Sequence, residues 1–271
     1  QVLAHLANQP FTQEFISVKL CRLFVHDDFA IGYDFTDPNL SPEGKLVRAC
    51  MAAWESGSPK GQIRQVLATI FNSELFRSAN ASMQKVKTPL EFAASAVRAL
   101  SSQNGDGTYT ATTDGNFQAA LNRFGNMSLF DRDTPDGYPE AGPPWISAGT
   151  LAARIRWIQT FLMPLNGRGS VTDMDKSTYC DPVALLKKKL PSGSWTNAGA
   201  VAEYFVGILY PGEGYANMDQ YRAAAVNFLN TADNGTTASP FSGLVLTSSA
   251  YDLRVRGMVA MLMTLPRFNE Q

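Results

Sequence analysis

The stretch Thr12-Gln13-Glu14-Phe15-Ile16-Ser17-Val18-Lys19-Leu20-Cys21-Arg22-Leu23-Phe24-Val25 decides the fold class of this chain. Its apolar residues recur at helical spacing, and Lys19 and Arg22 are left for the outer face. Thr12 has a side chain suited to an N-cap, so we expect the helix to begin there and to end before Asp27-Asp28. The pattern predicts an α-helix with one buried face.

Further helical patterns follow this stretch, each introduced by a capping signal. Two of these signals consist of a cap, a first-turn Pro and an acidic residue in order: Ser41-Pro42-Glu43 and Thr88-Pro89-Leu90-Glu91. Ser147 and Asp181 begin two more helices, and Arg154 occupies a polar position in the first of them. The last patterns cover residues 197–209, 218–229 and 250–265. Because no strand alternates with these helices, we predict an all-α fold.

The middle of the chain breaks this regularity. Residues 129–145 are rich in Pro, Gly and Asp, which excludes regular structure, and a loop this long usually has a function or packs on its own aromatic side chains. We therefore predict an irregular multi-helix protein with a helical unit at 1–100, a loop-rich segment at 101–146 and a second helical unit at 147–271, which together form one compact domain.

The two ends of the chain share a pattern. Arg64 to Phe76 and Arg256 to Phe268 each have a basic start, an apolar helix and a closing Phe. This similarity has two explanations. Either the ends are related helical units around the loop, or they are unrelated amphipathic helices, which commonly look alike.

Charge and composition narrow the class of protein. With 23 basic and 24 acidic residues, the formal net charge is -1, so no global field attracts nucleic acid or an anionic membrane. No apolar run approaches the roughly 18 residues of a membrane-spanning helix. Charged residues make up only 17% of the chain, a balance commoner in exported proteins than in cytosolic ones.

The three cysteines, Cys21, Cys50 and Cys180, lack the spacing of a zinc or redox motif. Cys21 and Cys50 lie in apolar helical patterns, where either buried free thiols or a disulfide in an oxidising compartment would fit. Cys180 lies in a polar stretch, and we expect it to be the most exposed of the three thiols.

Several of these segments together resemble the bacterial domain of unknown function 1800 (DUF1800) family. They occur in the family's order: Thr12–Val25, Leu67–Arg77, Lys85–Phe92, Pro135–Pro139 and Trp145–Arg154. The resemblance implies a mainly helical, exported protein that corresponds to the C-terminal part of a longer family chain. It also implies a protein partner, because family members are often encoded beside a second exported protein of phosphatase-like fold. The family supplies no agreed reaction, cofactor or catalytic residue, and this chain departs from its pattern by an insert at 103–116.

The loop at 129–145 holds the best candidate site. Its aspartates Asp131, Asp133 and Asp136 offer hard oxygen ligands for calcium, or they bind their own backbone as turn residues do. Tyr138 and Trp145 either face a carbohydrate or pin the loop to the helices. A weaker oxygen cluster surrounds Asn104 and Asp106. The predicted binding surface comprises Asp131, Asp133, Asp136, Tyr138, Glu140 and Trp145.

Other chemistry finds little support in the residues. His26 beside Asp27 and Asp28 is either a metal or catalytic cluster or a helix-end capping arrangement, and the second is the commoner. No nucleophile elbow, phosphate loop or dinucleotide fingerprint occurs, so the sequence demands no organic cofactor. We expect an exported protein-binding or assembly module of the cell envelope. The alternatives are an extracellular hydrolase of polymeric carbohydrate, using the loop carboxylates, and a subunit of a surface lattice or filament.

Overall fold

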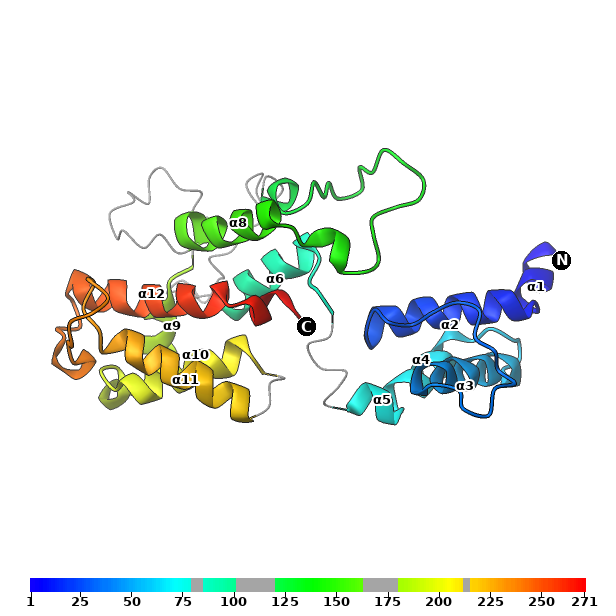
Figure 1. The fold of residues 1–271 in the computed structure, drawn as a ribbon, viewed down its shortest axis with the longest axis horizontal. Coiled ribbons are helices and arrows are strands. Elements are labelled where there is room, and N and C mark those ends of the chain that lie inside the picture. Colours follow the sequence, from blue (N-terminus) through cyan, green and yellow to red (C-terminus); the bar gives the residue numbers. More distant parts are fainter. Residues whose placement is uncertain (79–84, 101–119, 163–179, 212–214) are drawn as a thin grey trace. The chain divides into compact units, whose positions relative to one another are not determined.

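A computed structural model describes residues 1–78, 85–100, 120–162, 180–211 and 215–271 (Figure 1). Across these ranges the chain forms α-helices, short 3-10 helices and one π-helical turn, and contains no strand. An isolated bridge between Thr231 and Ala238 closes a turn. The predicted all-α, irregular multi-helix fold is confirmed. None of the helices within the described ranges has the length and apolar character needed to cross a membrane.

The chain is divided into two compact units. Unit 1 comprises Gln1–Val86, Pro139–Gly142 and Gln271, and unit 2 comprises Lys87–Tyr138 and Pro143–Glu270. The chain therefore passes from one unit to the other after Val86, Tyr138, Gly142 and Glu270. The first boundary falls after Val86, whereas the sequence analysis set it after residue 100.

Unit 1 is built on three packed helices. α2 and α3 pack together, and α4 packs on both. Its helices are α1 (Val2–Ala7), α2 (Pro10–Phe24), α3 (Pro42–Ser56), α4 (Ile63–Phe71) and α5 (Glu74–Arg77). The core contains Val18, Cys21, Val47, Cys50, Val66 and Ile70, all with no exposed surface. Ser41 caps α3 by accepting a hydrogen bond from the Gly44 N–H, as predicted.

The α2 helix buries a different face from the one predicted. It begins at Pro10 rather than at Thr12, and it buries Glu14 while Phe15 keeps 42% of its surface exposed. The Glu14 carboxylate accepts the Gly32 and Tyr33 N–H groups at 2.7 and 3.0 Å. Because two backbone donors satisfy this carboxylate, the helix can turn it inward to hold the following loop.

Unit 2 surrounds one central helix, α12 (Ser249–Thr264), which contacts helices on several sides and buries most of its residues (Figure 1). Its neighbours are α8 (Ala148–Trp157), α9 (Pro182–Lys189), α10 (Ala198–Leu209), α11 (Tyr215–Leu229) and the π-helical turn η2 (Ile158–Leu162). The other elements are α6 (Pro89–Ala99) and the 3-10 helices η1 (Pro143–Trp145), η3 (Ser192–Ser194), η4 (Phe241–Gly243) and η5 (Pro266–Asn269). A duplication, one of the two explanations of the pattern shared by the chain's ends, would match α4 with α12. These helices differ in burial, and both explanations stay open.

The predicted caps of unit 2 are confirmed. Thr88 and Glu91 form a complete capping box on α6, Ser147 caps α8, and Asp181 accepts two first-turn N–H groups of α9. These side chains satisfy donors that would otherwise have no intrahelical partner. Cys180, in contrast, has no exposed surface, so the prediction of an exposed thiol was wrong.

Candidate functional site

The predicted loop is closed by one aromatic side chain. The Tyr138 hydroxyl accepts the Ser128 N–H at 2.7 Å and donates to the Ser128 carbonyl at 2.9 Å. The Tyr138 ring lies 5.9 Å from the Trp145 ring, and the Arg132 guanidinium lies 5.0 Å from the Tyr138 ring centre. Of the two readings of Tyr138 and Trp145, these contacts fit the one in which they pin the loop. We call residues 128–138 the closed loop.

Trp145 anchors the base of this loop inside unit 2. Its side chain is buried, and it packs against the backbone of Gly125, which has a φ of 152°. A Cβ placed on Gly125 would lie 2.8 Å from Trp145 Cε3 and 3.1 Å from Cζ3. Only glycine therefore allows this close approach.

We expect Gly125→Ala to lower the free energy of unfolding by about 1–3 kcal/mol, because the new methyl group overlaps a buried indole ring. Chemical denaturation monitored by tryptophan fluorescence measures this loss. Gly193→Ala is the matched control, since a Cβ there meets no atom within 4 Å. Equal midpoints for the two variants would show that Trp145 moves aside without cost.

The tip of the closed loop presents an aromatic residue to solvent. Phe130 is exposed to 107% of its reference surface and has a φ of 61°, and the neighbouring Leu129 keeps 39% exposed. The Asp131 N–H bonds the Ser128 carbonyl at 3.4 Å, which makes Phe130 the third residue of a tight turn. Turns with positive φ at this position favour Gly or Asn, so a Phe there is an outlier. Phe130 was not among the residues predicted to form the binding surface.

The three aspartates of the predicted surface lie on this loop and are all exposed. The Thr134 hydroxyl donates to Asp136, and this hydrogen bond lowers the pKa of the Asp136 carboxyl. Asp136 therefore makes the local contact of a turn residue. Glu140, the remaining predicted carboxylate, belongs to unit 1, where it pairs with Lys19 at 2.6 Å. The structure thus divides the predicted binding surface between the two units.

Metal ligation finds no geometric support in the part of the chain that the structure describes. No group of three or more His, Cys, Asp and Glu side chains is placed there to hold an ion. His26 is buried, and its Nδ1 accepts the Asp28 N–H at 3.2 Å while its Nε2 lies 3.7 Å from Glu43. The ring therefore makes the local contacts of a helix end, with the Glu43 carboxylate beside it. The cluster at Asn104 and Asp106 lies outside the described residues.

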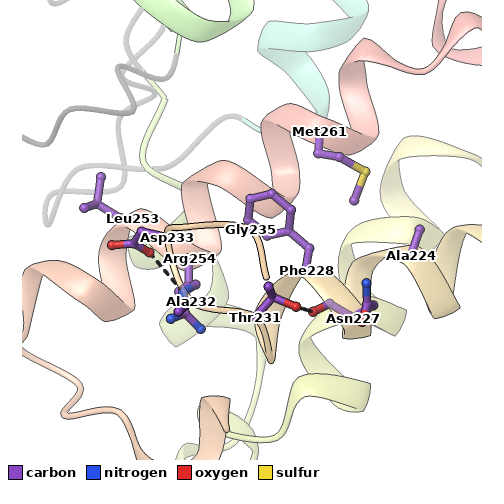
Figure 2. Close-up of a pocket in the computed structure, with 10 residues that line it drawn as sticks. All are labelled: Ala224, Asn227, Phe228, Thr231, Ala232, Asp233, Gly235, Leu253, Arg254 and Met261. Carbon is purple, nitrogen blue, oxygen red and sulfur yellow. Dashed lines mark hydrogen bonds and ion pairs between the residues drawn. The ribbon is translucent and has the colours of Figure 1, made fainter. Parts of the chain in front are cut away.

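A pocket of about 320 Å³ opens between α11, α12 and the turn after α11 (Figure 2). Phe228 and Met261 supply its apolar lining, and Asp233 and Arg254 supply charge. Arg254 binds Asp233 at 3.2 Å, the Leu229 carbonyl at 2.8 Å and Ser239 Oγ at 3.2 Å. Through these bonds the Arg254 guanidinium holds the turn after α11 in place. The sequence showed a Gly- and Thr-rich turn here but gave no sign of the pocket.

Two cations are buried in unit 2 close to aromatic rings. Lys87 Nζ donates to the Phe268 carbonyl at 2.8 Å and lies 4.2 Å from the centre of the Phe268 ring. Arg154 is 1% exposed, donates to Asn269 Oδ1 and to the Lys87 carbonyl, and lies 4.7 Å from the centre of the Phe92 ring. Its Nε finds no hydrogen-bond partner among the described residues. The prediction that Arg154 occupies a polar, outward position was wrong.

Burial has a measurable effect on these cations. It lowers the pKa of Lys87 to about 8, with a further contribution from the nearby charge of Arg154. It also lowers the pKa of Arg154 to about 10. Arg154 ties together Lys87, α8 and the η5 segment, which are far apart in sequence. A sequence pattern cannot reveal such partners.

The segments that carry the family resemblance lie in both units. Thr12–Val25 forms most of α2, and Lys85–Phe92 and Trp145–Arg154 supply the two buried cations. A family model described as "Protein of unknown function (DUF1800)" matches residues 1–270, nearly the whole chain. No curated protein and no solved structure matches the chain. The chain therefore belongs to the DUF1800 family of proteins of unknown function.

Proposed function

We propose that this protein is an exported binding module whose closed loop, residues 128–138, docks onto a protein partner. The observation that supports this most strongly is Phe130, a fully exposed aromatic residue held at a φ of 61°. Because the Phe130 ring is exposed, it adds no hydrophobic stabilisation to the folded protein. Its positive φ lowers the stability of the fold by about 1–3 kcal/mol. Such a cost at an exposed position is typical of a residue kept for recognition.

The closed loop has the form of a protein-binding element. Aromatic residues at the centre of an interface contribute a large share of binding energy when they fill a partner's pocket. The two Tyr138 hydrogen bonds to Ser128 fix the ends of the loop, so Phe130 loses less conformational entropy on binding than it would on an open loop. The loop is thus organised before the partner arrives.

The charges around Phe130 specify the partner's chemistry. Asp131, Asp133 and Asp136 are exposed within the same loop, and Arg132 is the basic residue among them. A complementary surface would have an apolar pocket rimmed by Lys or Arg side chains, and the charges would raise the association rate most at low salt. The exported phosphatase-fold protein that the family resemblance implies is our candidate partner.

The proposal is tested by placing a photo-crosslinking benzoylphenylalanine at position 130 of the full chain in its native cells. We expect one discrete crosslinked protein, because residue 130 inserts into the partner. The same amino acid at position 245 is the control, since Val245 lies in the same unit and is 66% exposed. Equal crosslinking patterns at the two positions would contradict the proposal.

A second variant separates binding from folding. Phe130→Gly should weaken affinity for the crosslinked partner by about 30-fold or more, the loss expected for a central aromatic anchor. It should also raise the free energy of unfolding by up to about 1 kcal/mol, because glycine adopts positive φ without steric cost. Unchanged affinity would refute the role of Phe130. Release of sugar by the purified chain, lost in Asp133→Asn, would favour the hydrolase instead.

A further inference from the structure

We propose that Cys21 and Cys50 form a disulfide that joins α2 to α3 within the core of unit 1. The two residues are 29 positions apart in sequence, and each has no exposed surface. Their helices pack together, and both thiols belong to the same apolar cluster. The fold thus brings together two of the three cysteines of the chain.

Both cysteines are free thiols in the structure, and they lie beside one another. They share a side-chain hydrogen bond, which together with burial raises the pKa of the Cys21 thiol. A disulfide requires the two sulfurs to approach to about 2 Å with their Cβ atoms on facing sides. Because α2 packs on α3 and the two thiols lie next to one another across that interface, the fold places both cysteines where a disulfide can join the two helices.

The chemical setting indicates when the bond would form. In the folded, reduced protein the cluster around the pair consists of apolar side chains such as Val18, Val47 and Ile70, so thiolate formation is suppressed and oxidants are excluded. The bond therefore forms during folding, while the chain is open. Once folding is complete, the same burial protects the disulfide from reductants, as is typical of a structural disulfide.

The reaction is thiol–disulfide exchange. The thiolate of one cysteine attacks a small-molecule disulfide or the disulfide of a thiol oxidoreductase, and it releases one thiolate from that oxidant. The second cysteine then attacks the mixed disulfide and releases the other thiolate. Two protons leave the cysteines, which lose two electrons, and the oxidant is reduced to two thiols.

Cys180 is an internal control for this inference. It is fully buried like the pair, and burial raises the pKa of its thiol to about 12. It belongs to unit 2, whereas both members of the pair belong to unit 1. Burial alone would therefore treat the three thiols alike, while the proposed disulfide singles out Cys21 and Cys50.

The inference rests on the proposed export, since disulfides persist in oxidising compartments. Two experiments distinguish a failure of the proposed disulfide from a failure of the proposed export. In the first, the reduced and unfolded full chain is refolded with reduced and oxidised glutathione, then denatured and treated with a mass-tagging maleimide. We expect one tagged thiol, in the peptide of Cys180, and a linked pair of peptides containing Cys21 and Cys50. Three tagged thiols, or linkage to Cys180, would overturn the disulfide.

The variants make the first arm specific. Cys180→Ala should leave the linked peptides intact, whereas Cys21→Ala should leave Cys50 and Cys180 both tagged. The melting temperature of the refolded wild-type chain should fall by an amount on the order of 10 °C when the disulfide is reduced, and that of Cys21→Ala should not change. An equal response of the two proteins to reductant would contradict a stabilising link.

The second arm examines the protein in its native cells, where acid quenching and thiol labelling trap its redox state. A linked pair there supports both the disulfide and the export. A pair that links during refolding but stays reduced in the cell would overturn the proposed export while leaving the geometric assignment of the pair intact.

Discussion

Raising the pH from 7 to 10 is expected to increase the free energy of unfolding of the wild-type chain by roughly 2 to 3 kcal/mol relative to that of a Lys87→Met variant. Burial and the Arg154 charge lower the pKa of Lys87 from 10.5 to about 8. Folding therefore favours the neutral amine. Below pH 8 the folded protein carries a buried cation whose desolvation opposes folding.

The direction of this effect follows from proton binding. Between pH 8 and 10.5 the folded state has released the Lys87 proton and the unfolded state still holds it. Stability therefore rises with pH across this window, and the destabilising contribution disappears above it. Glu91 opposes the shift in the pKa of Lys87, but its influence is smaller than those of burial and Arg154.

The measurement compares denaturant unfolding of the two proteins at several pH values, with reductant present throughout. The difference between them isolates Lys87 because tyrosines, thiols and other lysines titrate in both. A difference that does not change between pH 7 and 10 would show that Lys87 keeps its ordinary pKa in the folded protein.

Replacing Arg154 with Ala is expected to lower the free energy of unfolding by about 3 kcal/mol or more. The change leaves a cavity beside Phe92 and removes the donors that satisfy Asn269 Oδ1 and the Lys87 carbonyl. Relief of the buried charge offsets part of this loss. Denaturation monitored by the fluorescence of the neighbouring Trp157 measures the effect.

Arg156→Ala is the control for that experiment, because Arg156 lies on the same helix with an exposed side chain and should change stability by about 0.5 kcal/mol or less. Arg154→Ala should also reduce the pH-dependent gain described for Lys87, since it removes a neighbouring positive charge. Equal stabilities for the two arginine variants would contradict the structural role of Arg154.

Sequence patterns predicted the helices of this protein well where local signals act alone. Capping side chains at Ser41, Thr88, Ser147 and Asp181 satisfy nearby backbone donors, so their effect is visible within a few residues. The buried faces were harder to predict. Glu14 faces inward because its partners, Gly32 and Tyr33, lie on a later loop, which helical periodicity does not register.

The candidate site shows the same contrast between local and distant information. The composition of residues 129–145 indicated an irregular loop, and of the two roles it allowed for the aromatic residues, the Tyr138 contacts fit the one that pins the loop. It did not indicate that Glu140 belongs to unit 1 and pairs there with Lys19, because that contact depends on the path of the chain. Phe130 escaped notice since an apolar residue in a loop ordinarily packs inward. The adjacent pair Leu129-Phe130 in a turn was the available signal.

Residues Pro139–Gly142 belong to unit 1, although the segments before and after them belong to unit 2. Cleaving the chain at one position therefore cannot separate the two units. The Asp27 carboxylate accepts the Gly142 N–H at 2.6 Å, and a Cβ on Gly142 would collide with Val86. A fragment of residues 1–86 would lack Pro139–Gly142, and the Asp27 carboxylate would lose the backbone donor that Gly142 supplies. Evolution cannot shuffle such interleaved units as independent modules, so insertions and deletions should accumulate within each unit and spare the points where the chain changes from one to the other.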